Sequence, residues 1–227
     1  MAQNKLVLIF GAGPNIGAAV TKTFRSNGYN VALVSRKGAS DDADLECQHL
    51  KADLTQPHAV AEHGCAPNVV IYNAASVHFS QIDNPLNIEQ TDFEADLAVN
   101  LVSAYVAAQL AVIGFEKLPA DIPKSFIYTG NALNVTPHPL VLTLGVGKTA
   151  MAHTIECAAG AYAAKGWTFY YADERFEDGS PVRDQINGPA HAARFWELSQ
   201  DRTQHPWMDT FVAGIGYKKF EPKPFSL

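Results

Sequence analysis

Residues 5–17 read KLVLIFGAGPNIG, an apolar and β-branched run followed at once by a turn with three glycines. The run predicts a buried strand over residues 5–10, and the apolar spacing after the turn predicts a helix over residues 15–26. A strand, a glycine-rich turn and a helix N-terminus in this order direct backbone N–H groups and the positive end of the helix dipole toward one point. The turn, with Gly11 and Gly13 near that point, therefore predicts a pyrophosphate site, and a plain helix cap is the alternative.

Strand-like and helix-like segments keep alternating along the chain, as they do in repeated βα units. Several strand candidates are apolar throughout, which is typical of a parallel sheet covered on both faces. We predict an α/β fold with a single domain over residues 1–227, a Rossmann-like, doubly wound parallel sheet of about seven strands, and helices on both faces. Further strands are predicted at 30–35, 49–52, 68–72, 125–128 and 167–171, and further helices at 88–115 and 144–165; the tail from Gly214 is expected to form or follow the last strand.

The composition excludes several classes of protein. Hydrophobic residues make up 47% of the 227 residues and charged residues 18%, far from the composition of a disordered chain. The net charge of −6 offers no basic surface for nucleic acid or an anionic membrane, and no apolar run is expected to span a bilayer. Three cysteines without CxxC spacing predict reduced thiols, and the spacing of His58, His63 and Cys65 fits no common metal site. We expect a protein of the cytoplasm that binds no metal.

The two long helix candidates, at 88–115 and 144–165, are rich in alanine and apolar on more than one face. One face of each must cover the sheet, so the remaining apolar surface predicts contact with another copy of the chain, in a homodimer or a homotetramer. Close packing of small alanines within one chain is the alternative.

The glycine turn and three later motifs resemble, in register, the short-chain dehydrogenase/reductase family. The family's GxxxGxG turn is matched by Gly11, Asn15, Ile16 and Gly17. Asn15 stands in place of the middle glycine, and asparagine is the residue that best tolerates a left-handed backbone after glycine. The resemblance implies that the turn still binds a dinucleotide.

The end of the second strand bears on which dinucleotide is bound. Ser35, Arg36 and Lys37 stand where relatives that prefer NAD carry an acidic residue for the ribose diol. Two cations there suit a 2′-phosphate, so NADP(H) is favoured over NAD(H); a solvated basic turn is the alternative. The resemblance also implies that Asp53 with Leu54 contacts the adenine.

Two asparagines complete the matched motifs. Asn73 and Ala74, in IYNAAS, resemble the family's NAG motif at the end of the fourth strand. Asn100, in LAVNL, lies in mid-helix, where asparagine has poor propensity unless its amide has a task. In the family this asparagine holds a helix kink and a water chain to the catalytic lysine.

The resemblance breaks at the catalytic groups. The family uses a Ser after the fifth strand and a YxxxK motif, in which the tyrosine protonates the substrate oxygen and the lysine holds the nicotinamide ribose. Asn131 stands in place of the Ser, Leu144 in place of the Tyr, and Lys148 is retained. The separation 144 − 131 = 13 agrees with the family, so these are substitutions in place. Leucine cannot donate a proton, whereas Asn131 can still hydrogen-bond a carbonyl.

Three residues near the expected site could donate a proton in place of the missing tyrosine. Asp173 follows the sixth strand, where charged residues lie at the mouth of a site; an ion pair with Arg175 or a loop cap is the alternative. Tyr128, at the end of the fifth strand, is either an acid or a packed aromatic. His78 could face the substrate, although a solvated loop histidine is the simpler interpretation.

Three functions remain open for a small-molecule substrate. The first is an NADP(H)-dependent reductase whose acceptor, such as an imine or enone, needs little protonation. The second is non-redox chemistry, such as cyclisation or isomerisation, with Asp173, Asn131 and Tyr128. The third is a catalytically silent binding protein. In each case residues 173–204 are expected to replace the usual substrate loop, and only 73 − 53 = 20 positions separate Asp53 from Asn73, enough for a truncated helix.

Overall fold

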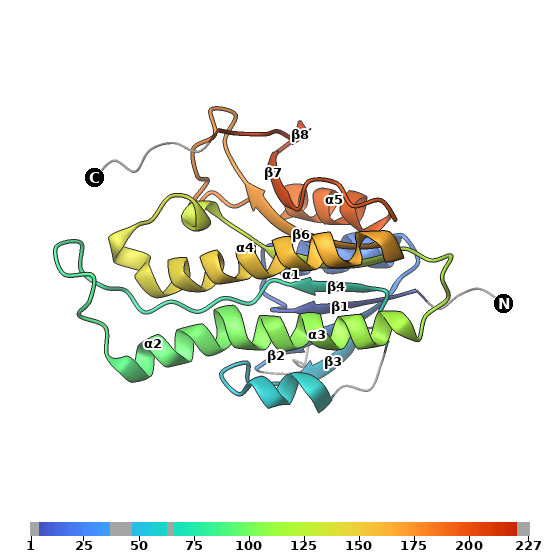
Figure 1. The fold of residues 1–227 in the computed structure, drawn as a ribbon, viewed down its shortest axis with the longest axis horizontal. Helices are drawn as coiled ribbons and strands as arrows, with labels where there is room; N and C mark the ends of the chain where they lie inside the picture. The colour runs from blue at the N-terminus through green and yellow to red at the C-terminus, as the bar shows by residue number, and fades with distance from the viewer. Residues whose placement is uncertain (1–4, 37–46, 63–65, 222–227) are drawn as a thin grey trace.

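Eight strands form one sheet in the order β3-β2-β1-β4-β5-β6-β7-β8, and all pairs except β7–β8 are parallel. The structure is a computed structural model that describes residues 5–36, 47–62 and 66–221, so Lys37, His63 and Cys65 lie outside the described residues. The predicted doubly wound sheet is confirmed (Figure 1). The strands are β1 (Leu6–Phe10), β2 (Asn30–Ser35), β3 (Gln48–Lys51), β4 (Val69–Tyr72), β5 (Lys124–Thr129), β6 (Trp167–Glu174), β7 (Met208–Val212) and β8 (Gly216–Tyr217).

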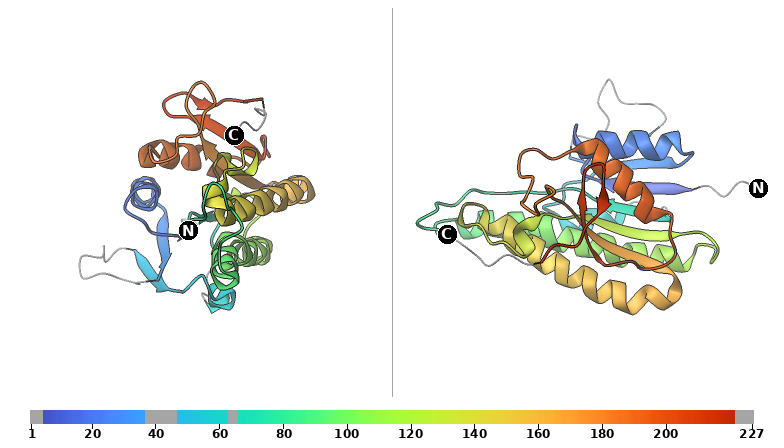
Figure 2. Two further views of the ribbon diagram at one scale, coloured as in Figure 1. Left: turned by 90° about the vertical axis from the view of Figure 1, so that its left-hand side faces the viewer. Right: turned by 90° about the horizontal axis from the view of Figure 1, so that it is seen from above.

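Helices cover both faces of the sheet, as the end-on view in Figure 2 shows. On one face lie α1 (Ile16–Ser26) and α5 (Gly188–Ser199), which pack on a core of alternate strand residues such as Ile9, Ile71 and Phe211. On the other face lie α2 (Gln90–Leu97), the π-helical turn η2 (Ala98–Val102), α3 (Ser103–Glu116) and α4 (Leu142–Tyr162). Short 3-10 turns are η1 (Pro57–Glu62), η3 (Ala132–Asn134), η4 (Pro139–Val141) and η5 (Ala163–Lys165).

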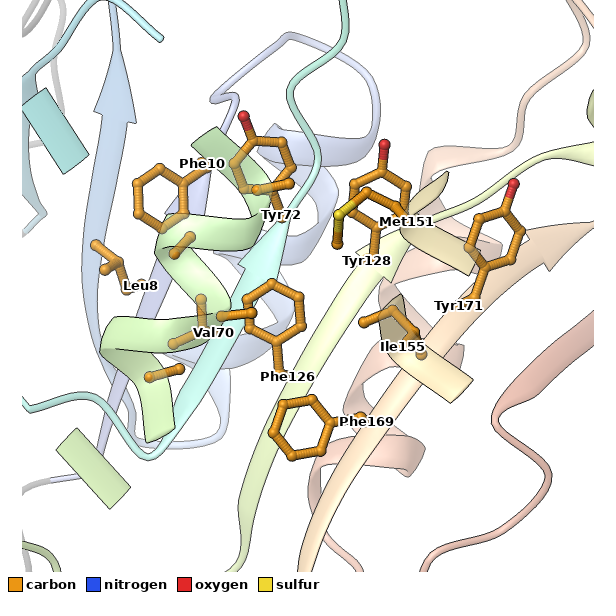
Figure 3. Close-up of a cluster of buried hydrophobic side chains, with 14 of the residues drawn as sticks. Leu8, Phe10, Val70, Tyr72, Phe126, Tyr128, Met151, Ile155, Phe169 and Tyr171 are labelled. Atoms are coloured by element: carbon orange, nitrogen blue, oxygen red, sulfur yellow. The ribbon is translucent and has the colours of Figure 1, made fainter. Parts of the chain in front are cut away.

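A row of aromatic rings crosses the sheet beneath α3 and α4 (Figure 3). Phe10, Tyr72, Tyr128 and Tyr171 occupy paired positions on β1, β4, β5 and β6, and their ring centroids are separated by 5.4, 5.8 and 5.8 Å. All four rings are buried, and offset stacking adds to the free energy gained by burying their area. The row places three tyrosine hydroxyls near the carboxyl ends of the strands, the edge at which open α/β sheets bind ligands.

The C-terminal part of the chain differs most from expectation. The strand predicted at 167–171 runs on to Glu174, because Asp173 and Glu174 are buried beside β7 instead of leaving the sheet. The tail from Gly214 follows β7 and contains the two-residue β8, in agreement with the expectation that it forms or follows the last strand. Helix α5 was not predicted, because its residues lie in a segment interpreted only as a substrate loop.

Two helical segments bear on other expectations. Among the residues between β3 and β4 that the structure describes, the 3-10 turn η1 is the only helical element, which agrees with the truncated helix expected there. Helices α2, η2 and α3 together form one continuous helix, Gln90–Glu116, that is long and apolar enough, by length and composition, to cross a membrane. The mean hydropathy of its most apolar 18-residue stretch is 1.8, and 44% of that stretch is buried inside the protein. The expectation that no apolar run reaches this length was therefore wrong. In this structure Ala104, Ala107 and Phe115 of the helix pack on the sheet.

Candidate functional site

The glycine turn packs directly on the end of β4. Gly11 has a φ of +91°, and a Cβ added to it would lie 2.6 Å from the backbone nitrogen of Ala74. Asn73 joins the same contact, since its Nδ2 donates to the Gly11 carbonyl at 2.9 Å. A Cβ on Gly17 would lie 2.8 Å from the Gly11 oxygen, whereas a Cβ on Gly13 would point into open space. The turn therefore requires glycine at 11 and 17 for packing, and at 13 it leaves room for a ligand.

Asn15 does not adopt the left-handed conformation that the resemblance implied. Its φ is −92°, so this expectation was wrong. Its side chain instead connects the turn to the segment before α5: Nδ2 donates to the Ile186 carbonyl at 2.9 Å, and Oδ1 accepts from the Gly188 N–H at 3.0 Å. Ile16, the next residue, is buried as the first residue of α1. Asn15 thus connects the glycine turn to the loop between β6 and α5.

The candidate adenine edge lies at the ends of β2 and β3. Ser35 is the last residue of β2, and Arg36 follows it with an exposed side chain. Asp53 accepts hydrogen bonds from Thr55 N at 3.0 Å and Thr55 Oγ1 at 2.9 Å. These bonds, with a smaller contribution from the Arg36 charge, lower the pKa of Asp53. Leu54 is buried beside them. Arg36 and Asp53 are thus close enough to interact electrostatically.

Asn100 lies in the π-helical turn and is completely buried. Its side chain closes two hydrogen bonds with Ser76, from Nδ2 to the carbonyl at 2.7 Å and from the Ser76 N–H to Oδ1 at 3.0 Å. A Cβ on Gly147 would lie 2.5 Å from the Cβ of Asn100, so α4 can approach the π turn only with glycine there. Asn100 therefore joins the loop after β4 to helix α4.

Tyr128 is not placed to act as an acid. Its ring is fully buried between Tyr72 and Tyr171, and its hydroxyl donates to the Asn100 carbonyl at 2.8 Å. Burial raises the pKa of Tyr128 well above its ordinary value. The alternative of a packed aromatic is the one that the structure shows, and the proposed catalytic role of Tyr128 is withdrawn.

Lys148 is buried on α4, one helical turn after Leu144. Its Nζ donates to the Thr129 carbonyl at 2.7 Å and lies 4.4 Å from the centre of the Tyr128 ring. Burial lowers the pKa of Lys148 to about 7, against the opposing effect of Asp173. Burial therefore favours the neutral amine over the ammonium group.

Asp173 lies within β6 and is only 1% exposed, so it does not stand at the mouth of a loop as expected. Arg175 donates twice to its Oδ2, from Nε at 2.7 Å and from Nη2 at 2.6 Å. The other oxygen, Oδ1, is buried and has no hydrogen-bond partner in the described chain. Burial raises the pKa of Asp173, while Arg175, His191 and Lys148 oppose the rise. The anticipated ion pair with Arg175 is present, and one carboxylate oxygen is left free.

Asn131 makes two hydrogen bonds through its backbone and one through its side chain. Tyr171 Oη donates to the Asn131 carbonyl at 2.8 Å and accepts from its N–H at 3.1 Å. The Asn131 Oδ1 caps η3 through Leu133 N at 3.0 Å, and within the described chain its Nδ2 makes no hydrogen bond. Sequence reasoning missed Tyr171, although the paired tyrosines in the fifth and sixth strands could have indicated it.

A second buried carboxylate, Asp96 of α2, was also missed. It is completely buried and accepts from Ser76 Oγ, Thr143 Oγ1 and His78 N, each at 2.6 Å. Its Oδ1 also lies 3.0 Å from His78 Nδ1. Burial opposes ionisation, but these hydrogen bonds together lower the pKa of Asp96. His78 is thus anchored and not a free loop histidine. The sequence feature that could have indicated Asp96 is its place one helical turn before Asn100.

Comparisons with known proteins agree with this arrangement. The short chain dehydrogenase/reductase dmxR12 of Cryptosporiopsis sp. (strain 8999) is 42% identical over 236 residues, covering 96% of both chains. Among solved structures, BdcA, determined in complex with NADPH, has a TM-score of 0.71 at 18% identity over 95% of this chain and 96% of its own. ElxO, determined with NADP bound, has a TM-score of 0.74 at 17% identity over 93% and 97%.

No protein-family model matches the chain. The two solved structures show the shared fold, and the relative from Cryptosporiopsis sp. shows the family, because its 42% identity extends over nearly the whole of both sequences. With the glycine turn, Asn73, Asn100 and Lys148 brought to one edge of a doubly wound sheet, the chain belongs to the short-chain dehydrogenase/reductase family.

Proposed function

We propose that this protein is an NADP(H)-dependent oxidoreductase that reduces a small organic substrate without a tyrosine acid. One observation supports the proposal: the glycine turn packs on the end of β4 and Lys148 is buried beside the end of the neighbouring strand β5, while Leu144 stands one helical turn before Lys148. The acceptor is then an imine, an enone or a carbonyl that is protonated by another group. Two neighbours in fold, BdcA and ElxO, were determined with NADPH and NADP, which supports the choice of cofactor.

The described residues fit such a cofactor. The open space at Gly13 and the N-terminus of α1 suit the pyrophosphate. Asp53 and Arg36 suit the adenosine half, and Lys148 suits the hydroxyls of the nicotinamide ribose. Asp173 Oδ1 is buried without a hydrogen-bond donor in the described chain, so a donor of a bound molecule could satisfy it. When bound, NADPH supplies a hydride to the substrate.

Cofactor preference is tested at Arg36. We expect Arg36→Ala to weaken NADPH binding at least about tenfold, because a charge-assisted contact with the 2′-phosphate is worth about 1.5–3 kcal/mol. NADH, which has no such phosphate, should bind equally to both proteins. Titration calorimetry measures the two constants, and Lys22→Ala, an exposed cation on α1, is the matched control. An equal loss for both cofactors would contradict the assignment.

We propose that Asp173, with Lys148 beside it, supplies the proton that the family's tyrosine would supply. Each of the two groups shifts the pKa of the other, both are buried, and burial favours their neutral forms. A proton bound by this pair can leave for a substrate atom at the free Oδ1. Asn131, whose Nδ2 is unengaged, is placed to donate a hydrogen bond to the substrate oxygen. Asn100 acts through Ser76, so we assign it a positioning role.

The reaction and the role of Asp173 are tested together. Loss of NADPH absorbance with a panel of imines, enones and aldehydes should reveal turnover, and Asp173→Asn should lower kcat at least about 100-fold. Asparagine keeps an oxygen for Arg175, so the NADPH dissociation constant should change less than about threefold. Asp201→Asn, a surface change, is the control. Full activity of Asp173→Asn would remove this residue from the mechanism.

The same panel separates the other two functions. Product formed without NADPH oxidation, and lost in Asp173→Asn, would indicate non-redox chemistry at the same carboxylate. NADPH binding without any reaction would indicate a binding protein.

We propose a homo-oligomer of the cytoplasm, assembled through the outer faces of α3 and α4. Val102 lies at the α3 end of η2, Tyr105 and Ile113 lie on α3, and Val146 lies on α4; their side chains are 40–51% exposed. Large apolar side chains gathered on neighbouring helices are typical of an interface between copies.

A further inference from the structure

A cavity of about 920 Å³ lies beside the candidate site, between the segment before α4, the loop after β6 and the β7–β8 hairpin. Its volume falls within the range of pockets for small ligands, about 300–1,000 Å³. Its walls include the aromatic side chains of Trp207, Tyr217 and Phe220 and the apolar side chains of Val135 and Met208. These side chains suit a flat, apolar molecule.

The cavity borders the reacting groups proposed above at two points. Arg175 lines the cavity and also holds Asp173, the carboxylate with the free oxygen. Met208 lines it and contacts Asn134 of η3, the turn that Asn131 caps, at 3.8 Å between Nδ2 and Sδ. A molecule in the cavity would therefore contact Arg175, which holds Asp173, and Met208, which contacts the turn that Asn131 caps.

Among the charged residues that line the cavity, Arg183 is distinctive. Arg175 is paired with Asp173, and Lys219 lies 3.8 Å from Glu221. The fifth charged lining residue, Asp178, accepts hydrogen bonds from Ser180. Arg183 makes no hydrogen bond or ion pair within residues 5–36, 47–62 and 66–221.

The backbone at Arg183 is also unusual. Its φ is +51°, which makes it the only residue other than glycine with a positive φ in the described chain. The left-handed conformation is costly for a side chain of this size, and such strain tends to be kept where a side chain must be aimed at a ligand. Arg183 thus combines a strained backbone, an exposed side chain and the lack of a hydrogen-bond or ion-pair partner within the described residues, and it lines the cavity.

We propose that the cavity binds the substrate as a flat, apolar carboxylate, an aromatic acid, with Arg183 holding the carboxylate. The planar guanidinium suits bidentate binding of a carboxylate, and the aromatic walls suit the ring system. This assignment of substrate class rests on the proposed function, because the cavity reaches Asp173 only through Arg175, its ion-pair partner.

The test uses two probes of matched shape, 2-naphthoate and the neutral 2-naphthylmethanol, titrated calorimetrically into the full chain without cofactor. Arg183→Gln should weaken 2-naphthoate about tenfold and leave the alcohol unchanged, since tenfold corresponds to about 1.4 kcal/mol, the size of one such contact. Arg202→Gln, an exposed arginine outside the cavity, should change neither constant. Equal binding of 2-naphthoate to Arg183→Gln and the parent protein would overturn the proposal.

Two further measurements keep the result interpretable. Arg183→Gly relieves the left-handed strain, so its Tm should rise while 2-naphthoate binding falls, which excludes unfolding as the cause. Quenching of tryptophan emission by 2-naphthoate should disappear in Trp207→Phe, where Trp167 and Trp196 remain. Quenching that persists would place the probe elsewhere and overturn the proposal. Because no cofactor is present, this outcome is independent of whether NADPH binds.

Discussion

Replacing Gly11 by alanine is expected to abolish NADPH binding and to destabilise the fold. The new Cβ would lie 2.6 Å from Ala74 N, and the φ of +91° is costly for alanine, by about 1–3 kcal/mol for the conformation alone. The neighbouring backbone cannot withdraw cheaply, because Asn73 donates from N to Phe10 O at 2.8 Å and from Nδ2 to Gly11 O at 2.9 Å. We expect the NADPH dissociation constant to rise more than about 100-fold, since a shift of about 1 Å at a binding site has effects of that order.

Gly13→Ala is the matched control for stability. No heavy atom lies within 4 Å of its added Cβ, and its φ is not positive, so unfolding by urea should give nearly the parent value. Weakened NADPH binding with parent stability is expected there, because the methyl group would occupy the ligand space. Parent-like stability of Gly11→Ala would show that the turn is less tightly packed on β4 than described.

The second large effect is expected at Asp96. Asp96→Ala removes the acceptor of three hydrogen bonds of 2.6 Å and leaves Ser76 Oγ, Thr143 Oγ1 and His78 N without it in a buried site. Each unsatisfied buried donor costs about 1–3 kcal/mol, so we expect a loss of about 3–5 kcal/mol in the free energy of unfolding. Denaturant unfolding measures it directly.

The same carboxylate predicts a dependence of stability on pH. The pKa of Asp96 is lower in the folded protein than the ordinary value of 3.8, so the folded state binds its proton more weakly than the unfolded state. The contribution of Asp96 to folding stability is therefore complete above the ordinary pKa and is lost as the pH falls through the folded value.

The control for Asp96→Ala is Asp92→Ala. Asp92 is an exposed neighbour 3.6 Å from His78 Nε2, and its replacement should cost less than about 0.5 kcal/mol in the free energy of unfolding. A similar loss in both variants would contradict the assignment.

Periodicity and glycine chemistry were enough to predict the architecture. The apolar strands, the turn at Gly11 and the short connection before β4 each follow from local sequence, and the structure confirms them. Helix α5 was not predicted, because its alanines and its Pro189 followed a polar loop and no apolar stripe was evident. Its position depends on contacts with α1 that no local pattern records.

The catalytic side was harder to predict, because exposure cannot be read from a residue's place in the chain. Tyr128 and Asp173 both stand near strand ends, where open sheets have their sites. The structure buries the first in a row of aromatic rings and pairs the second with Arg175. The hydrogen bonds of Asn15 to residues 186–188 join segments more than 170 positions apart, and no spacing rule could have indicated them.

The π-helical turn at Ala98–Val102 has a consequence for comparing this chain with its relatives. The turn holds one residue more than an α-helix of the same length would, and the carbonyls of Val99 and Asn100 accept the hydroxyls of Tyr72 and Tyr128 at 2.6 and 2.8 Å. The π turn absorbs this extra residue, so deleting one residue there would regularise the helix and leave the later side chains of α3 on nearly the same faces. An alignment with a relative that lacks the π turn therefore needs a one-residue gap inside the turn, because without the gap every later residue of α3 would be assigned a direction about 100° from its own.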